Sequence, residues 1–415
     1  MRSYRPLIGF IFLAIVVVGI LIGLSIANYR FAKDNPGGND FLARWMGARF
    51  WLMEGTSPYA EQVSMASQQA IYGHAADPQK GEDKNHFVYP MTSMIFFAPF
   101  GLLEYLYARA LWMTVLEVSI FLIAVLGLRL VDWSLSPVKT AILVLFSVLW
   151  YHSARTIMIG QFAGLNAVLI VFGLILIRKK QDFVAGLVLA LTTTKPQMTF
   201  LLIPFILLWA LSVRRWELWW GIWGGFLGTL GLSLAFIPDW PLQMLRQVLD
   251  YPSYTNIGSP LTVIANAMPG ISRSLILFLH AAVGSLLLVE WILAWGQGER
   301  HFLWAAMMTM VITNLVAFRT ATTNYVMLLP AIYLIFSVWE ERWTAIGRAL
   351  VWVNLLMLGI GIWALFLYTV EGNVEHASMY LPVPIYCLFG LWWVRWWAIR
   401  PPRLPFQQMV SKLRL

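Results

Sequence analysis

Long apolar segments separated by short polar joints run through most of this sequence. Apolar segments of about 20 residues are typical of helices that cross a bilayer, whereas membrane β-barrels need alternating segments of about ten residues. The pattern therefore predicts an all-α, polytopic transmembrane protein with about 12 membrane spans. The first apolar segment is 7–27, and the later predicted spans are 110–130, 140–154, 160–177, 216–237, 274–295, 302–318, 325–339, 346–370 and 380–398.

Two apolar stretches are too short for ordinary crossings. Residues 91–103 would form a helix of only about 20 Å, and it contains Pro99, so we expect a re-entrant or shallow segment. Residues 183–213 have room for two short helices, with Thr192-Thr193-Thr194-Lys195-Pro196 at the bend between them. Such pairs usually line a cavity, because exposed backbone is tolerated at that depth only beside protein or water.

The longest polar interval, 28–90, follows the first span. Arg2 and Arg5 precede that span, so the N-terminus is expected in the cytoplasm and this first loop outside it. A helix is predicted from Asp40 to Met53. Its apolar face would lie in the membrane interface, and Gly55 would end it. This face consists of Phe41, Trp45, Ala48 and Leu52, with Arg44 and Arg49 off it.

Composition and charge support a membrane protein. Hydrophobic residues make up 60% of the chain and charged residues 12%, about half the share expected of a soluble domain. The net charge of +9 lies in the short joints and at the termini, which indicates a lipid bilayer and not nucleic acid as the partner. Cys387 is the single cysteine, which excludes an internal disulfide. We treat 1–415 as a single integral membrane domain, with a second extracytoplasmic loop at 238–273.

Two groups of short motifs, in a definite order and spacing, resemble glycosyltransferase family 87. These are GT-C-type polytopic enzymes that include the bacterial polyprenyl-phosphate-mannose-dependent mannosyltransferases. The resemblance reaches from about residue 39 to residue 330. Its motifs are Asp40-Phe41, Trp45, Ala48, Gly55, Pro58-Tyr59, Tyr89-Pro90 and Ala98-Pro99, then Arg155, Gly160-Gln161, Asn166, Ala185-Gly186 and Lys195-Pro196, and, more loosely, Leu328-Leu329-Pro330.

The resemblance implies transfer of a sugar from a polyprenyl-phosphate donor to an extracytoplasmic glycolipid or glycan acceptor, with inversion at the anomeric carbon. A mannose-type hexose is the expected sugar, with arabinofuranose as an alternative. The acceptor hydroxyl must lose a proton, so one carboxylate base is needed, while the lipid phosphate leaves without an acid and needs only cations. The pair of carboxylates of a retaining enzyme is not required. We expect no cofactor, no metal, and a site on the outer side of the plasma (inner) membrane.

Asp40 is the candidate general base, by the resemblance and by its position. The alternative is that Asp40 caps the helix it precedes, and Asp34 is a nearby competitor without the motif. Lys195 is the first candidate for the donor phosphate, because a lysine between apolar segments is costly and usually functional, although it could also be a solvated lysine at a helix end. Arg155 and Arg319 are further phosphate candidates, with a plain loop role as the alternative for Arg319.

Gln161, Tyr89, Asn324 and Tyr325 are candidate substrate-binding residues. For Gln161 a structural role between helices is equally compatible, and for Tyr89 a place in the interfacial aromatic belt. Family members often carry a histidine near the position of Asn324, so this chain departs from the pattern there. The six histidines, among them His74 and His86 of the first loop, are scattered and are placed outside the site.

Two other classes of protein remain open from the sequence. A transporter or flippase of lipid-linked saccharides could use the same charged cavity, but it would favour internal repeats and charges at mid-membrane depth along several spans. A scaffolding membrane subunit is the other alternative, against which the large first loop argues.

Overall fold

The computed structural model describes residues 5–254, 258–317, 320–372 and 375–400. Its regular structure is helical, and no strand occurs within these ranges. The α-helices of the described residues are α1 Arg5–Asp34, α2 Asn39–Glu54, α3 Glu61–Tyr72, α4 Met94–Gly101, α5 Tyr105–Leu130, α6 Pro137–Leu149, α7 Tyr151–Met158, α8 Ala163–Arg178, α9 Asp182–Leu191, α10 Leu202–Ser212, α11 Trp216–Phe236, α12 Trp240–Asp250, α13 Pro260–Asn266, α14 Ser272–Ala294, α15 Glu299–Val316, α16 Leu329–Leu356, α17 Ile362–Thr369 and α18 Pro382–Ala398.

Six helical stretches in the described ranges are long and apolar enough to cross a membrane, or seven if α6 and α7 count as one bent span. The all-α class is thus confirmed, whereas the predicted number of about 12 spans is not. The span predicted at 140–154 corresponds to this bent pair and is not one continuous helix. Trp150 has extended backbone with ψ 139°, which interrupts the helix, and α6 and α7 meet at 52°.

One of the six stretches, Thr322–Thr369, has 48 residues. A straight helix of that length would measure about 70 Å, more than twice the hydrocarbon core of a bilayer. It is broken inside α16 at Thr344, which has φ 42° and ψ −104°. This break lies at the joint predicted between 325–339 and 346–370, so the stretch has the length and the break of two crossings.

The helix predicted from Asp40 to Met53 is present as α2, and Gly55 ends it with φ 64° as expected. Its burial differs from the prediction in two places: Leu52 is exposed, and Arg44 is buried. Protein covers the rest of the apolar face, where Phe41 stacks on Trp112 of α5. The helix is therefore confirmed, while its predicted location in the membrane interface is not.

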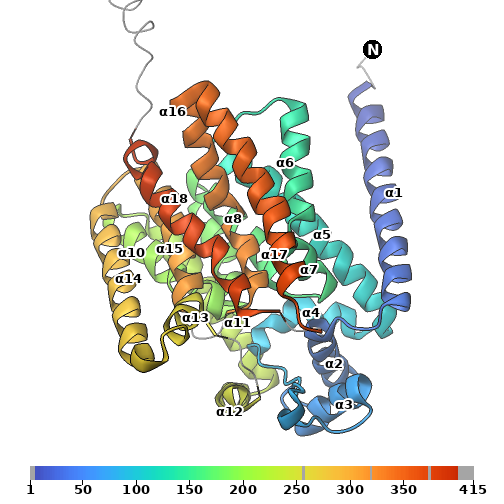
Figure 1. Ribbon diagram of the computed structural model, residues 1–415. Helices are drawn as coiled ribbons and strands as arrows, with labels where there is room; N and C mark the ends of the chain where they lie inside the picture. Colours follow the sequence, from blue (N-terminus) through green and yellow to red (C-terminus); the bar gives the residue numbers. More distant parts are fainter. Residues whose placement is uncertain (1–4, 255–257, 318–319, 373–374, 401–415) are drawn as a thin grey trace, which may run out of the picture.

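The loops and short segments are more helical than the polar pattern indicated. The first loop begins only after α1 ends at Asp34, and α12 and α13 occupy much of the predicted second loop. In Figure 1, α2, α3 and α12 lie together at one end of the bundle, opposite the N-terminal end of α1. The pair predicted in 183–213 is present as α9 and α10.

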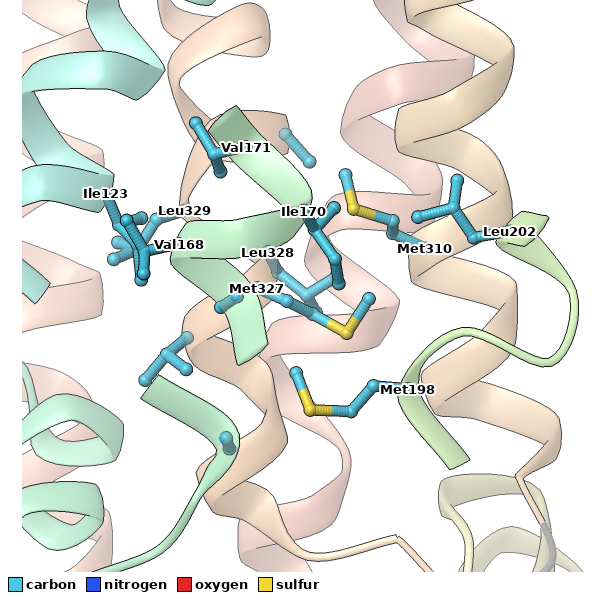
Figure 2. Close-up of a cluster of buried hydrophobic side chains, with 14 of the residues drawn as sticks. Ile123, Val168, Ile170, Val171, Met198, Leu202, Met310, Met327, Leu328 and Leu329 are labelled. Carbon is cyan, nitrogen blue, oxygen red and sulfur yellow. The ribbon is translucent and has the colours of Figure 1, made fainter. Parts of the chain in front are cut away.

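The core of the bundle lies where α5, α8, α10 and α15 meet the segment that leads into α16 (Figure 2). Fully burying one side chain of this kind contributes about 1.5–3 kcal/mol. This packing also fixes the two segments that carry the candidate site, because α8 begins two residues after Gln161 and Met198 lies three residues after Lys195. The residues at the centre are Ile123, Val168, Ile170, Val171, Met198, Leu202, Met310, Met327, Leu328 and Leu329.

Candidate active site

Asp40 lies in the first turn of α2 and does not cap it. The N-cap position is Gly38, whose backbone carbonyl accepts hydrogen bonds from the amides of Phe41 and Leu42, and no side-chain cap is formed. Gly38 has φ 73°, and a Cβ there would approach Arg109 Nε to 2.7 Å, so glycine is needed for this turn. The carboxylate of Asp40 is one-third exposed and remains available to other groups.

Arg44 lies one turn further along α2 and was not among the sequence candidates. Its guanidinium is 3.7 Å from Asp40 Oδ1 and stands 4.5 Å over the ring of Tyr89, a cation–π arrangement. The residue is only 9% exposed. The i,i+4 spacing from Asp40 was the signal that could have identified it.

Tyr89 connects the two segments of the first loop that contain Tyr59 and Tyr89 to Gln161 of the cluster. Its phenol donates a hydrogen bond to Gln161 Oε1 at 2.9 Å, and its backbone carbonyl accepts one from the phenol of Tyr59 at 2.6 Å. The Pro58-Tyr59 and Tyr89-Pro90 motifs are therefore in direct contact. Tyr89 is buried, and burial raises its pKa to about 12, so its phenol acts as a donor at neutral pH.

Gln161 approaches this cluster because the residue before it is glycine. Gly160 has φ +72°, and a Cβ there would lie 2.6 Å from Phe41 Cβ. Its carbonyl accepts a hydrogen bond from Trp112 Nε1 at 2.9 Å, which fixes the turn against α5. Gln161 Oε1 then accepts two hydrogen bonds, one from Tyr89 and one from Lys195 Nζ at 2.6 Å.

Lys195 lies in the turn between η3 (Thr192–Thr194) and η4 (Pro196–Met198), outside the candidate spans. The hydroxyls of the three preceding threonines donate to carbonyls three residues back, at 2.6–2.7 Å, which closes the end of α9. Lys195 itself is 1% exposed. Among the described residues its ammonium group has one hydrogen-bond partner, Gln161.

The charge of Lys195 is poorly compensated. Burial lowers its pKa to about 7, while the nearby carboxylate of Asp40 raises it and the guanidinium of Arg44 lowers it. The ammonium is 5.8 Å from the ring centroid of Tyr89. A buried cation whose direct partner is an amide is a site prepared for an anion, because an oxyanion there would restore the protonated form.

Two more polar residues lie in electrostatic range of Asp40 and Arg44. Asp83 belongs to the first loop and Tyr251 to η5 (Tyr251–Ser253) of the second, and neither was a sequence candidate. Burial raises the pKa of Asp83, and the negative charge of Asp40 raises it further. Nothing in the sequence pattern marked them, because their proximity depends on how the two loops meet.

A second polar network contains Arg155, the candidate arginine that lies within the described residues. Arg155 Nε is 3.6 Å from Glu375 Oε2, and this carboxylate also accepts hydrogen bonds from Tyr151 at 2.8 Å and from Thr322 at 2.7 Å. Arg155 is thus paired with an acid that the sequence pattern did not identify. Tyr380, which lies in electrostatic range of Glu375, Arg155 and Tyr251, is placed between this network and the Asp40 cluster.

The other two described candidates, Tyr325 and Asn324, make their hydrogen bonds outside this cluster. Tyr325 is buried, and its phenol donates to the carbonyl of Tyr380 at 2.8 Å. Asn324 is buried and donates to Thr320 Oγ1 at 3.1 Å, while its own Oδ1 has no hydrogen-bond partner in the described part of the chain. Arg319 lies outside the described residues. The structure therefore brings together Asp40, Tyr89, Gln161 and Lys195, with Arg44, and leaves Asn324 and Tyr325 at another position.

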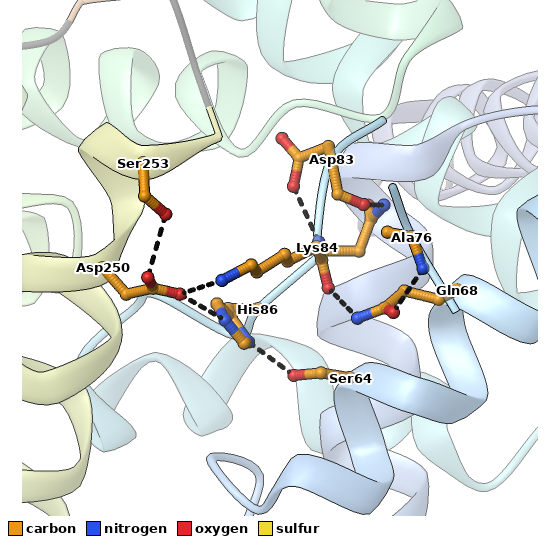
Figure 3. Close-up of polar contacts among 9 residues, drawn as sticks. Ser64, Gln68, Ala76, Asp83, Lys84, His86, Asp250 and Ser253 are labelled. Atoms are coloured by element: carbon orange, nitrogen blue, oxygen red, sulfur yellow. Dashed lines mark hydrogen bonds and ion pairs between the residues drawn. The ribbon is translucent and has the colours of Figure 1, made fainter. Parts of the chain in front are cut away.

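A clamp of polar contacts joins the first loop and α3 to the end of α12 (Figure 3). Asp250 Oδ2 accepts a hydrogen bond from Lys84 Nζ at 2.8 Å and lies 3.3 Å from His86 Nε2. His86 Nδ1 is 2.7 Å from the hydroxyl of Ser64 on α3. Ser64 is 2% exposed, which makes this Ser–His–Asp arrangement a structural link and not a nucleophile open to substrate. Within the described ranges, no group of three or more His, Cys, Asp or Glu side chains has a metal-binding arrangement.

The arrangement combines a partly exposed carboxylate with two buried cations at the end of the helical bundle where α2, α3 and α12 lie. A carboxylate of this kind can take a proton, and the cations can hold an anion. These features define a helical, multi-pass membrane protein with a polar site at one end of the bundle, in which positive charge is buried.

Comparison with known proteins identifies the family. The model of glycosyltransferase family 87 matches residues 87–319, more than half of the chain, and the chain belongs to this family. The match includes Tyr89, Arg155, Gln161 and Lys195, and it begins after Asp40. The chain is also 30% identical over 222 residues to the alpha-(1->3)-arabinofuranosyltransferase of Mycolicibacterium smegmatis, an alignment that covers 49% of this chain and 48% of that protein. The chain thus spans about half the length of this curated relative. No solved structure matches the chain.

Proposed function

We propose that this protein is a membrane glycosyltransferase with a GT-C-type fold. It moves a sugar from a polyprenyl-phosphate donor to a glycolipid or glycan acceptor on the extracytoplasmic side of the plasma membrane. Membership of glycosyltransferase family 87 supports the class of reaction. The observation that carries the proposal is the contact set of Lys195, a buried ammonium whose described hydrogen-bond partner is a neutral amide oxygen.

Asp40 acts as the general base. Its carboxylate is one-third exposed and does not cap the helix, so an acceptor hydroxyl can reach it. The hydroxyl oxygen forms a bond to the anomeric carbon as its proton passes to Asp40, and the bond from that carbon to the phosphate oxygen breaks with its electron pair on the phosphate. A single displacement of this kind inverts the anomeric carbon.

Lys195 and Arg44 hold the charge of the departing lipid phosphate. In the structure, Lys195 Nζ donates to Gln161 Oε1, so a phosphate oxygen would share or replace this hydrogen bond. Gln161 and Tyr89 then orient the ammonium and line the sugar pocket. Arg155 was expected to bind phosphate directly. Because the charge of Arg155 is already paired with Glu375, we do not place Arg155 in direct contact with the phosphate.

The family resemblance and the curated relative point to different sugars. A mannose-type hexose was the expectation, whereas the aligned relative is named for the transfer of arabinofuranose. We therefore include the pentofuranose as a donor on equal terms with the hexose. No residue contact in the structure discriminates between these two sugars.

The test is transfer of labelled mannose or arabinofuranose from synthetic polyprenyl-phosphate donors by the purified full-length protein, with Asp40→Asn as the variant. Loss of a general base should lower kcat by about 10²-fold or more. Asparagine keeps the size of the side chain, and its loss of charge in the first helical turn costs only about 0.3–1 kcal/mol of stability. Asp34→Asn is the matched control, because Asp34 is an exposed acid at the end of α1 and should be dispensable.

Each outcome decides between the alternatives. Equal transfer by the wild type and Asp40→Asn would show that the base lies elsewhere. A protein that transfers neither sugar, but moves lipid-linked saccharide across vesicles, would be the transporter.

A further inference from the structure

Asp83 lies in the part of the first loop that leads from α3 to Tyr89, and the residue is half-buried. The backbone amide of Asn85 donates a hydrogen bond to Asp83 Oδ1 at 2.7 Å, and the backbone amide of Asp83 donates one to the phenol oxygen of Tyr72 at 3.0 Å. The turn that carries Asp83 is therefore fixed. Within the described ranges, Asp83 forms no ion pair and its Oδ2 accepts no hydrogen bond, so one oxygen of the carboxylate remains available.

The end of α12 is fixed against this part of the first loop (Figure 3). Gln247 Nε2 donates a hydrogen bond to the backbone carbonyl of Tyr59 at 3.0 Å. Three residues later, Asp250 Oδ2 accepts a hydrogen bond from Lys84 Nζ at 2.8 Å. These two contacts set the position of the residues that follow α12, which are η5 and Tyr254.

Two tyrosines follow α12 and pack on each other. The rings of Tyr251 and Tyr254 meet edge to face, with centroids 5.4 Å apart. Tyr254 also contacts the first loop, since its ring centroid is 5.6 Å from that of His86 and 5.4 Å from Lys84 Nζ. Tyr254 is 8% exposed, and its phenol oxygen has no hydrogen-bond partner in the part of the chain that the structure describes. Because a buried hydroxyl without a partner is costly, this group points to a ligand or an ordered water molecule.

Asp40 and Arg44 connect these residues to Lys195. Asp83 lies in electrostatic range of Asp40 and Arg44, and so does Tyr251. Lys195 lies in range of the same two charges, but it comes from the turn that follows α9 and η3. The carboxylate of Asp40 is therefore shared by two groups of residues. One group contains a buried cation, and the other contains a carboxylate and tyrosine rings.

The two groups favour different ligands. An anion is attracted by the ammonium of Lys195 and repelled by the carboxylate of Asp83. The group around Asp83 instead suits an uncharged ligand with several hydroxyls. Such a ligand donates charge-assisted hydrogen bonds to a carboxylate and can share one with a phenol, while its apolar C–H face packs on an aromatic ring. These are the features of a saccharide, and they differ from those of a lipid phosphate.

The stereochemistry of the reaction selects between the donor sugar and the acceptor. In an inverting displacement the nucleophile approaches the face of the sugar ring opposite to the leaving group. With the donor phosphate at Lys195, the acceptor hydroxyl therefore reaches Asp40 from the group that contains Asp83 and Tyr251.

We propose that Asp83, Tyr251 and Tyr254 form the subsite for the acceptor saccharide. Asp83 accepts a hydrogen bond from a hydroxyl next to the reacting one and so positions the acceptor, while the proton of the reacting hydroxyl passes to Asp40. This inference rests on the proposed function and adds to it the residues that hold the acceptor.

The experiment measures transfer from synthetic polyprenyl-phosphate mannose or arabinofuranose to octyl mannoside and octyl arabinofuranoside by the full-length protein in nanodiscs. In Asp83→Asn the side-chain oxygen can still accept the amide of Asn85, so the turn is kept while the charge is lost. We expect its acceptor KM to rise about tenfold, because a hydrogen bond to a charged group is lost. The kcat and the dissociation constant of the donor should change little. Tyr254→Phe should raise the acceptor KM about threefold, because a neutral hydrogen bond is lost.

The matched controls lie outside the subsite. Glu61→Gln removes the charge of an exposed acid in the first turn of α3. Tyr386→Phe removes another buried phenol without a partner among the described residues, on α18. Both controls should keep the acceptor KM of the wild type. Because Tyr254→Phe keeps the ring, it tests the subsite even where Asp83→Asn folds poorly.

The outcomes separate the subsite from the proposed function. An unchanged acceptor KM in Asp83→Asn and Tyr254→Phe, in a protein that transfers sugar, would overturn the subsite and leave the function standing. A fall in kcat at unchanged KM, or an equal weakening of donor binding, would also overturn it. If the wild type transfers neither sugar, saturation-transfer NMR with methyl mannoside and methyl arabinofuranoside decides. Binding lost only in the two subsite variants would then support a saccharide site without the function, and equal signals in all variants would refute the site.

Discussion

Lys195 gives the sharpest test of the candidate site, because its protonation should control donor binding. Burial lowers the pKa of the free ammonium to about 7, and a bound phosphate would raise it. A polyprenyl-phosphate sugar is a phosphodiester, so its own charge is constant near neutral pH. Only the protonated lysine attracts it, and the dissociation constant of the donor must therefore rise with pH.

The expected magnitude follows from the pKa. Between about pH 6 and pH 8 the protonated fraction of a group with a pKa of about 7 falls from about nine-tenths to about one-tenth. The dissociation constant of the donor, measured without acceptor, should rise about tenfold over this range. The Lys195→Arg variant should bind with no such slope, because arginine stays charged. Lys195→Met should bind weakly at every pH.

The assay is equilibrium binding of a labelled donor to purified protein, with Asp40→Asn as an additional arm. The carboxylate of Asp40 raises the pKa of Lys195, so its neutralisation should move the midpoint of the titration to lower pH. A dissociation constant that is flat in the wild type would refute the assignment of Lys195 as the phosphate partner. A slope that persists in Lys195→Arg would assign the titration to another group.

Two further predictions concern the frame around the site. Gly160→Ala should lower the thermal unfolding temperature by the equivalent of about 1–3 kcal/mol, because the added Cβ meets Phe41 and φ is +72°. The control is Gly228→Ala, which should be neutral or mildly stabilising because no atom lies within 4 Å of the new Cβ. Equal losses of stability in the two variants would contradict the close approach at Gly160. The loop clamp should loosen on acidification. Burial lowers the pKa of His86, so the stability linked to this group is complete above about pH 6.5, the unfolded value, and is lost as pH falls below it. Limited proteolysis of the first loop should show this in the wild type and in His74→Asn but not in His86→Asn, and an unchanged pH dependence in His86→Asn would assign it to Lys84, Asp250 or another group.

The parts of the fold that the sequence predicted are those that depend on local pattern. The long apolar segments α5, α11 and α14 appear within a few residues of their predicted ranges, because length and hydropathy alone define them. The pair α9 and α10 was also predicted, since the basic joints Arg178-Lys179-Lys180 and Arg214-Arg215 left too little chain between them for longer helices. The bend at Trp150 was not, because a buried Trp in an apolar run gives no local signal for extended backbone.

The sequence identified single residues of the site but not the contacts between them. Lys195 and Gln161 were each picked from their own motif, and the structure shows that they form one hydrogen bond across 34 positions. Arg44 was assigned to the polar side of an amphipathic helix. That reasoning takes burial to be apolar, and it fails where a guanidinium is buried against the ring of Tyr89 and next to a carboxylate. Glu375 was missed because all of its partners, Arg155, Tyr151 and Thr322, lie far from it in the sequence.

The charges of the bundle differ in how they are compensated, and this difference separates structural cations from functional ones. Arg178 pairs with Asp132 at 2.7 Å. Arg395 pairs with Glu290 at 2.8 Å, and that carboxylate is almost fully buried. These pairs stabilise charge within the fold and leave little for a ligand. Lys195 is more deeply buried than either arginine, yet its direct partner is an amide. Because an uncompensated buried charge is costly, Lys195 would be stabilised most by a bound anion, which supports the proposal of a phosphate-bearing substrate at the polar cluster.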